Sequence, residues 1–290
     1  MLYTLKNGTL TVEISDMGAE IMSVKKDGVE YIWQRDEKYW ASCTPIMFPV
    51  CGRLFGFKYT YKGKEYAMEN HGFIRKTVMD VKEQTDNSIV FAFSANEDSL
   101  KQYPFMFDIE ISYRLDENNL YSEIYVKNTG DDILPFAPGA HPGFCVPIDG
   151  KGDFSDYYIE FEEGVNPDHM IFTPTCYQTG LKKALKLESG YRLPLHHDMF
   201  DNDAIFMSRA GKKVTLKSDI TDRYVTLYCA DFPYLGLWHM PKTDAPYVCI
   251  EPWSGLPSYD GVTDDFSDRS DMFRLEKGGS KTVGYAICFG

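Results

Sequence analysis

The sequence predicts an all-β protein, built as a large antiparallel β-sandwich with few short helices. Aromatic residues make up 15% of the chain, with 20 Tyr and 19 Phe, and large aromatic side chains favour strands. Apolar and polar residues alternate with a period of two in several segments, as half-buried strands require. Helical periodicity is scarce, so the strands are expected to follow one another without the intervening helices of a parallel sheet.

Two hairpin signals mark the N-terminal part of the chain. Residues 9–15 alternate apolar and polar side chains and are predicted to form a half-buried strand. The pairs Asn7-Gly8 and Asp27-Gly28 are typical of tight hairpin turns. We therefore expect antiparallel hairpins at both positions.

The clearest strands are expected in the middle of the chain. Residues 88–94 form a denser apolar run, which predicts a strand covered on both faces. Residues 107–115 alternate cleanly and are expected to meet residues 120–126 across the Asp- and Asn-rich turn 116–119. The best helical candidate, residues 97–103, is short and stops before a proline.

We interpret residues 1–290 as a single domain. No linker, low-complexity tract or internal repeat divides the chain, and large all-β folds reach this length as one unit. The oligomeric state stays open between a monomer and a homodimer.

The composition argues against nucleic acid and membrane partners. The chain has 43 Asp and Glu against 30 Lys and Arg, a formal net charge of −13, and no dense cationic run to attract a polyanion. No apolar stretch reaches the roughly 18 residues of a membrane helix, and the N-terminal residues lack a signal-peptide pattern. Seven dispersed cysteines without a secretion signal are expected to be reduced thiols, so we expect a cytoplasmic protein.

Sequence motifs for cofactors are absent, and we expect neither a cofactor nor a metal. The dinucleotide, P-loop and zinc-protease signatures do not occur, nor does the nucleophile elbow of the α/β-hydrolases. His196 and His197, with Asp198, Asp201 and Asp203, are residue types that bind metals. Adjacent side chains on an extended segment point to opposite faces, however, so we interpret this segment as a polar loop followed by a strand.

Four segments place titratable groups among prolines, glycines and aromatic residues. Their sequences are TPIMFPVCGR (44–53), ENHGFIRK (69–76), PFAPGAHPGF (135–144) and VCIEPWSGLP (248–257). A lone histidine in an apolar loop, such as His141 in the third segment, usually has only a packing role. A glutamate beside a proline and a tryptophan, such as Glu251 in the fourth, can simply cap a turn. Together, however, they supply an acid/base group that titrates near neutral pH and a carboxylate base, the minimum for moving protons without a cofactor.

Six short motifs occur in a fixed order over nearly the whole chain. They are FPVCGR (48–53), HGFIR (71–75), GAHPGF (139–144), FDNDA (200–204), FPYLGLW (232–238) and IEPW (250–253). In this order and spacing they resemble the aldose 1-epimerase (galactose mutarotase) family, and most of all its LacX-like branch. The resemblance implies a large antiparallel β-sandwich with an open sugar cleft. It also implies interconversion of the α and β anomers of a free aldose through the open-chain aldehyde.

The resemblance further implies roles for individual residues. His141 matches the general acid that protonates the ring oxygen, and Glu251 matches the general base that takes the proton from the C1 hydroxyl. His71 and Arg53 match residues that hydrogen-bond the sugar and polarise its ring and anomeric oxygens. Asp203 matches an aspartate that anchors sugar hydroxyls.

Four further residues are candidates for binding the substrate. Trp238 and Phe73 are candidates for aromatic walls against the apolar face of the sugar, with packing as the alternative role. Galactose mutarotases tend to have His-Gly-Gly where His71 begins the motif HGFIR, and this version is also similar to the hexose-6-phosphate 1-epimerases, which use arginines to hold a phosphate. Arg75 and Lys76 are therefore candidates for binding a phosphate, with a solvated strand face as the alternative.

Ring opening requires one proton to be delivered to the ring oxygen while another is removed from the C1 hydroxyl. Two positioned groups achieve this, and each contributes about 10²–10⁴-fold to the rate. We expect His141 to be protonated and Glu251 to be ionised in the resting complex. If Arg53 lies close to Glu251, its charge should hold the carboxylate ionised.

The sequence leaves three functions open. An epimerase acting on an aldohexose, with or without a phosphate group, is favoured. The second is a sugar-binding or sensing module with little turnover, and the presence of both His141 and Glu251 argues against it. The third is a glycosidase with paired carboxylates, for which Glu251 has no evident partner among the motifs.

Overall fold

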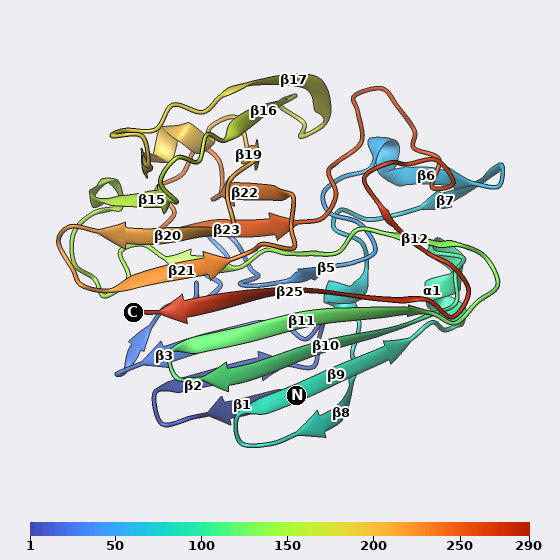
Figure 1. The fold of residues 1–290 in the computed structure, drawn as a ribbon, viewed down its shortest axis with the longest axis horizontal. Coiled ribbons are helices and arrows are strands. Elements are labelled where there is room, and N and C mark those ends of the chain that lie inside the picture. The colour runs from blue at the N-terminus through green and yellow to red at the C-terminus, as the bar shows by residue number, and fades with distance from the viewer.

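The computed structural model describes residues 1–290, and two large antiparallel sheets contain most of its strands (Figure 1). The larger sheet has nine strands. In spatial order they are β18 (Arg192–Pro194), β15 (Tyr157–Phe161), β20 (Lys213–Ser218), β21 (Tyr224–Tyr228), β25 (Ser280–Phe289), β11 (Asn119–Asn128), β10 (Phe107–Asp116), β9 (Ser88–Ser94) and β8 (Asp80–Gln84). The C-terminal strand β25 therefore joins strands from the first and second halves of the chain.

The second sheet has eight strands, including a strand that pairs off the main path. Along that path they are β17 (Gln178–Ala184), β16 (Asp168–Phe172), β19 (Ile205–Ser208), β22 (Tyr234–Trp238), β23 (Tyr247–Trp253), β13 (Gly139–Ala140) and β5 (Ile46–Met47). The remaining strand, β14 (Gly143–Cys145), also pairs with β23. β23 therefore has partners on both sides and lies in the interior of the sheet.

The other elements are small. A four-stranded sheet contains β1 (Leu2–Lys6), β2 (Leu10–Ser15), β3 (Ile21–Lys26) and β4 (Val29–Glu30). Two ribbons pair β12 (Leu134–Phe136) with β24 (Phe273–Leu275), and β6 (Lys58–Tyr61) with β7 (Lys64–Ala67). The helices are α1 (Glu97–Gln102) and the 3₁₀ turns η1 (Phe55–Phe57), η2 (Ile74–Lys76), η3 (Phe154–Asp156) and η4 (His197–Phe200). None of these helices combines the length and the apolar character needed to cross a lipid bilayer.

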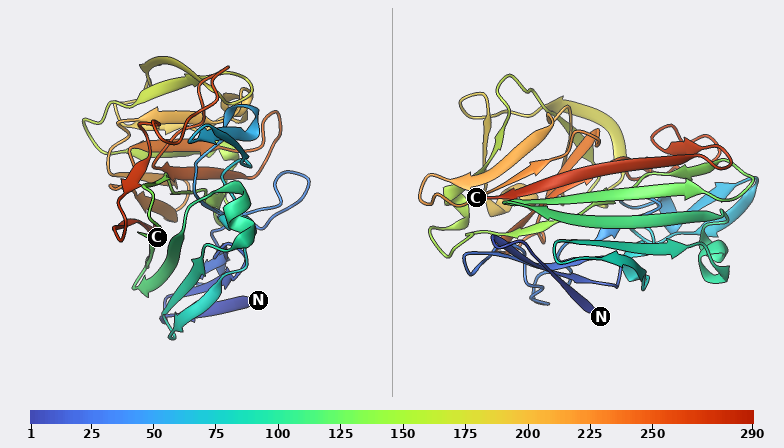
Figure 2. Two further views of the ribbon diagram at one scale, coloured as in Figure 1. Left: turned by 90° about the vertical axis from the view of Figure 1, so that its right-hand side faces the viewer. Right: turned by 60° about the horizontal axis from the view of Figure 1, so that its bottom comes forward.

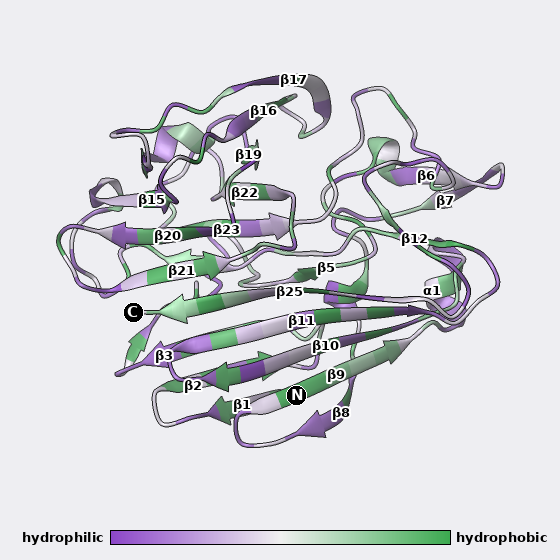
Figure 3. Cartoon of the chain, viewed as in Figure 1, coloured by the Kyte–Doolittle hydropathy of each residue, from purple (hydrophilic) through white to green (hydrophobic).

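The predicted fold class is confirmed, and the predicted strands are found where the alternation placed them. β2, β10 and β11 alternate buried with more exposed residues along their length, and polar and apolar segments alternate along the long strands in Figure 3. The two hairpin signals join β1 to β2 and β3 to β4. The short predicted helix is α1, and its N-terminus is capped by the Asn96 side chain.

One strand differs from its prediction. β9 was expected to be covered on both faces, but only Ile89 and Phe91 are buried, whereas Val90 and Ala92 on the other face are half-buried. The N-terminal strands form a layer beside the long strands of the nine-stranded sheet (Figure 2), and Tyr3 packs edge-on against Phe91 at 5.6 Å between ring centroids. This layer covers a single face, so the opposite face of β9 remains partly open to solvent.

A hydrophobic cluster of 65 buried residues extends from Leu5 near the N-terminus to Phe289 near the C-terminus. It includes side chains of the four-stranded sheet and of both large sheets. The interpretation of residues 1–290 as one domain stays a prediction, which this continuous core supports.

Candidate active site

The strand register brings His141 and Glu251 together. β23 pairs with β13 at Gly139–Trp253 and with β14 at Gly143–Cys249. Both pairs follow the same antiparallel register, and that register places His141 directly opposite Glu251. The ladder is interrupted between β13 and β14 because Pro142 has no backbone N–H to donate. The two side chains therefore form a cross-strand pair in the middle of a sheet, where such pairs are close neighbours.

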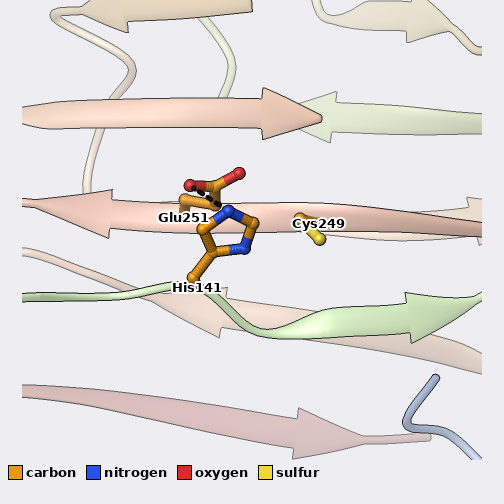
Figure 4. A group of neighbouring side chains, drawn as sticks. All are labelled: His141, Cys249 and Glu251. Carbon is orange, nitrogen blue, oxygen red and sulfur yellow. Dashed lines mark ion pairs between the residues drawn. The ribbon is translucent and has the colours of Figure 1, made fainter. Parts of the chain in front are cut away.

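The His141–Glu251 pair is buried and in direct contact. Nε2 of His141 lies 3.2 Å from Oε2 of Glu251, as Figure 4 shows, and the two side chains are only 9% and 1% exposed. The indole Nε1 of Trp253 donates a hydrogen bond of 3.0 Å to the same carboxylate oxygen. Nδ1 of His141 and Oε1 of Glu251 have no hydrogen-bond partner within the chain. Each member of the pair thus retains one free polar atom for a ligand.

Burial shifts the two pKa values toward the neutral forms. It lowers the pKa of His141 to about 3, and the charge of Arg75 adds a smaller effect in the same direction. It raises the pKa of Glu251 well above its usual value, against the opposing hydrogen bond from Trp253, and the nearby Asp203 raises it further. In this structure burial therefore favours the neutral forms of both groups, because removal from water penalises their charges, whereas the expectation of a protonated His141 beside an ionised Glu251 concerns the complex with sugar and stays a prediction.

Arg53 does not hold Glu251 ionised. Its Nη1 donates a hydrogen bond of 2.8 Å to the backbone carbonyl of Thr175, and its guanidinium lies over the ring of Phe57 at 5.6 Å. The carboxyl group of Glu251 is instead in contact with the imidazole of His141. Arg53 still lines the cleft described below, and its Nε atom is buried without a partner.

His71 is held in one tautomer by the backbone. Its Nδ1 accepts a hydrogen bond of 3.1 Å from the backbone N–H of Gly52, and the backbone N–H of His71 donates to the carbonyl of Gly52 at 2.9 Å. Burial, with the charges of the neighbouring His141, Arg75 and Arg53, lowers the pKa of His71 well below its ordinary value. A neutral imidazole that accepts through Nδ1 carries its proton on Nε2, so His71 offers a fixed N–H donor.

A cleft of about 280 Å³ contains the His141–Glu251 pair. All the predicted site residues except Phe73 and Lys76 line it, namely Arg53, His71, Arg75, His141, Asp203, Trp238 and Glu251. Trp238 meets the imidazole of His141 edge-on, with 5.5 Å between ring centroids. The sequence-predicted residues are thus brought to one place from strands and turns that are far apart in the chain.

Phe73 and Lys76 do not line the cleft. The ring of Phe73 is buried and packs against Phe48 at 6.2 Å, within the hydrophobic core, so its prediction as an aromatic wall is wrong. The ammonium of Lys76 pairs with the exposed carboxylate of Glu69 instead. Nη2 of Arg75 lies 3.8 Å from the same carboxylate, but its side chain also reaches the cleft wall.

Several lining residues were missed by the sequence analysis. The side chains that add chemistry or aromatic surface are Trp40, Ser42, Asn70, Cys176, Phe206 and Trp253. Trp253 belongs to the motif IEPW and Asn70 to the segment ENHGFIRK, so their proximity to Glu251 and His71 in the sequence could have suggested them. Trp40 lies outside every motif, yet its ring packs on His141 at 4.9 Å. It fits there because Gly143 has no side chain: a Cβ would lie 3.0 Å from the Trp40 ring.

Cys249 lies close to the pair, on the same strand as Glu251 (Figure 4). One potential ligand atom from each of Cys249, His141 and Glu251 lies within 4.8 Å of the others, a spacing that a metal ion could bridge. Burial raises the pKa of the Cys249 thiol well above its usual value, which disfavours the thiolate that metal binding requires. The donor set therefore fits a metal poorly.

The chain is similar in sequence to proteins of one known family. Residues 1–264 match the family model described as aldose 1-epimerase. The chain belongs to the aldose 1-epimerase family. Protein LacX (plasmid) of Lactococcus lactis subsp. lactis is 33% identical over 268 residues, which cover 88% of each chain. Membership places this aldose 1-epimerase family protein among the isomerases of carbohydrate metabolism.

Solved structures agree with this membership. The galactose mutarotase related enzyme from Lactobacillus acidophilus is 33% identical, with a TM-score of 0.95 over 100% of this chain and 97% of that chain. A galactose mutarotase-like protein from Lactobacillus casei ATCC 334 is 29% identical, with a TM-score of 0.93 over the full length of both chains. The fold of this aldose 1-epimerase family member is thus shared along its whole length.

Proposed function

We propose that this protein is a mutarotase that interconverts the α and β anomers of a free aldohexose, with His141 and Glu251 as acid and base. The observation that carries the proposal is the buried 3.2 Å contact between these two side chains in the wall of a cleft that polar and aromatic side chains line. A protein that only binds sugar needs neither a buried acid nor a buried base. The alternative of a sugar-binding module therefore leaves this pair without a purpose.

The reaction moves two protons in opposite directions. His141 delivers a proton to the ring oxygen, Glu251 takes the proton of the C1 hydroxyl, and the bond between C1 and the ring oxygen breaks to give the aldehyde. After rotation about the C1–C2 bond the two transfers reverse, and the ring closes as the other anomer. Oε1 of Glu251 has no partner within the chain and is the oxygen left to accept the hydroxyl proton.

The burial of the pair favours the protonation states that it has after the sugar ring opens. Ring opening removes a proton from the imidazolium and adds one to the carboxylate, so a charged pair becomes a neutral pair. Burial favours the neutral pair, as the directions of both pKa shifts show. The charged pair differs only in the position of one proton, which can cross the 3.2 Å contact without exchange with solvent.

The other cleft residues have roles in binding. The fixed Nε2–H of His71 is a donor for the ring or anomeric oxygen, and Arg53 supplies further N–H donors. Asp203 is an acceptor for sugar hydroxyls, and Trp238 provides an apolar surface for a ring face. Arg75 in the cleft wall, with its Nε unpartnered, favours a phosphorylated aldohexose as the second candidate substrate.

Polarimetry tests the proposal. Freshly dissolved α-D-glucose and α-D-galactose should reach anomeric equilibrium faster with the protein, and Glu251→Gln or His141→Gln should reduce kcat/KM by about 10²–10⁴-fold. Glu123→Gln, a matched change on the exposed side of β11, should leave the rate unchanged. A Glu251→Gln protein that keeps its rate would contradict the assignment of the base.

Two further arms separate the alternatives. Glucose 6-phosphate, followed by an anomer-specific coupled assay, should react faster than glucose only if Arg75 binds a phosphate, and Arg75→Gln should then abolish that preference. Sugar binding seen by calorimetry without acceleration for any of the three sugars would favour the binding module.

A further inference from the structure

A second cavity adjoins the catalytic cleft. It has the same volume, about 280 Å³, and Asp203 and Ala204 line both spaces. Its other walls come from β16, from η4 and from the turn that precedes β19, at the outer end of the eight-stranded sheet (Figure 1). Because Asp203 and Ala204 line both spaces, the second cavity lies directly beside the cleft that contains the His141–Glu251 pair.

The lining of the second cavity combines apolar surface with free polar groups. Its half-buried apolar side chains are Met170, Ile171, Phe172 and Met199. The imidazole of His169 and the amide of the exposed Asn202 lie beside them and have no hydrogen-bond partner within the chain. A pyranose ring has apolar faces and a rim of hydroxyl groups, so a lining with both kinds of surface suits it.

The charge of the second cavity differs from that of the catalytic cleft. Arg53 and Arg75 line the cleft, whereas the second cavity has no lysine or arginine in its wall. Burial lowers the pKa of His169 below its ordinary value, so this imidazole is neutral at pH 7. The wall itself offers no cation to a phosphate or carboxylate group, since Lys183, which pairs with His169 from β17, is not part of the lining, and a neutral glycosyl group fits better.

The shared wall is suited to a glycosidic linkage. Oδ1 of Asp203 accepts a hydrogen bond of 2.9 Å from the N–H of Ala204, which leaves Oδ2 for a hydroxyl at the junction of the two spaces. Ala204, the other shared residue, adds only a methyl group to this wall. A sugar bound in the cleft can therefore carry a second ring across this wall.

We propose that the second cavity is a subsite for a second sugar residue, and that the preferred substrate is a neutral reducing disaccharide. Its reducing residue occupies the catalytic cleft with C1 at the His141–Glu251 pair, and its second residue lies against Met170, Phe172 and Asn202. This inference rests on the proposed mutarotase activity. It goes beyond that activity by naming the class of substrate.

The test compares sugars that share a reducing residue. Polarimetry should give a kcat/KM at least about tenfold higher for one of maltose, lactose or melibiose than for glucose or galactose. Asn202→Trp, at an exposed position in the mouth of the second cavity, should remove that preference and leave glucose turnover within about twofold. Leu181→Trp, an exposed change on neighbouring β17 outside both spaces, should affect neither sugar.

The outcomes distinguish a failure of the proposed subsite from a failure of the proposed mutarotase activity. If glucose reacts but no disaccharide reacts faster, or if Asn202→Trp lowers both rates equally, the subsite is refuted while the mutarotase proposal stands. If no sugar reacts, the mutarotase proposal fails, and binding is followed by fluorescence, since three of the four tryptophans line the cleft. Tighter binding of a disaccharide than of glucose, lost in Asn202→Trp, then supports the subsite, and equal binding refutes it.

Discussion

Trp253→Phe is expected to change the rate and the pH profile of mutarotation in a defined way. The indole N–H of Trp253 donates the 3.0 Å hydrogen bond that stabilises the Glu251 carboxylate, and it lowers the pKa of that group against the effect of burial. Phenylalanine keeps an aromatic ring against Phe206 and His71 but has no donor. The substitution therefore acts on the ionised form of Glu251.

The magnitude follows from the energy of one hydrogen bond. A hydrogen bond to a charged group contributes about 1.5–3 kcal/mol, which corresponds to about 1–2 pKa units for the carboxyl. In this structure the neutral His141–Glu251 pair is favoured, so the charged pair that starts the reaction becomes harder to reach by the same amount. We expect kcat/KM on the pH plateau to fall about 10- to 100-fold.

The acid and alkaline limbs of the pH dependence of kcat/KM give a more specific test. The alkaline limb reports loss of the last proton from the pair, which leaves Glu251 ionised, so it should move up by about 1–2 pH units in Trp253→Phe. The acid limb reports addition of a proton to the neutral imidazole and should stay in place. The assay is polarimetry at each pH, with the spontaneous rate subtracted.

Trp238→Phe is the matched control, because the Trp238 indole also lines the cleft near His141 but has no hydrogen bond to the carboxylate. It should leave both limbs where they are. If the acid limb of Trp253→Phe moves up while the alkaline limb stays, the resting pair is charged and the argument from burial is refuted. If neither limb moves, the indole N–H does not act on Glu251.

Three further changes test the support of the site. Arg269→Ala should cost about 3–5 kcal/mol in urea unfolding, because the buried guanidinium has two aspartates within 3.1 Å; a loss below about 1 kcal/mol would show that the pairs are dispensable. Gly72→Ala should cost about 2–5 kcal/mol, measured by thermal unfolding, because φ is +69° and a Cβ would lie 2.1 Å from the Phe48 carbonyl oxygen. Burial lowers the pKa of His239 to about 4, below the roughly 6.5 of the unfolded chain. The neutral imidazole therefore makes its full contribution to the free energy of unfolding above about pH 6.5, and about 3 kcal/mol of this contribution is lost as the pH falls to 4. The free energy of unfolding of His239→Gln should therefore fall less between pH 7 and 4 than that of the wild-type protein. If the two proteins lose stability in parallel over this range, protonation of His239 is not the cause.

Most of the fold could be predicted because its signals are local. The alternation in β2, β10 and β11 is visible within six to ten residues, and the turns between strands depend on pairs such as Asn7-Gly8. The covering of β9 could not be predicted, since it depends on a layer contributed by the distant N-terminal strands, such as β1, whose Tyr3 packs against Phe91. The strand order, with β25 between β11 and β21, likewise depends on pairing across the chain.

The identity of the site residues was predicted better than their state. The motifs named His141, Glu251 and five of their neighbours in the cleft, but the protonation of the pair depends on burial that only the tertiary structure reveals. The error at Phe73 has a local cause. His71 and Gly72 both adopt positive φ angles, and the chain after this turn directs Phe73 into the core.

The geometry of the proposed acid and base is set by the sheet rather than by a loop. His141 and Glu251 are each followed by a proline and face each other in the register of β13, β14 and β23, so their separation is fixed by the backbone ladder on both sides of the gap. On the other side of Glu251 the paired residue is Gly236, which has no side chain to displace the carboxylate. Since strand positions vary less than loop positions, the pair can stay aligned during the proposed reaction, in which the sugar ring opens, rotates and closes between the same two groups. Specificity for the sugar can then be varied in the surrounding turns, such as the one that carries Asp203, without disturbing the proton transfer.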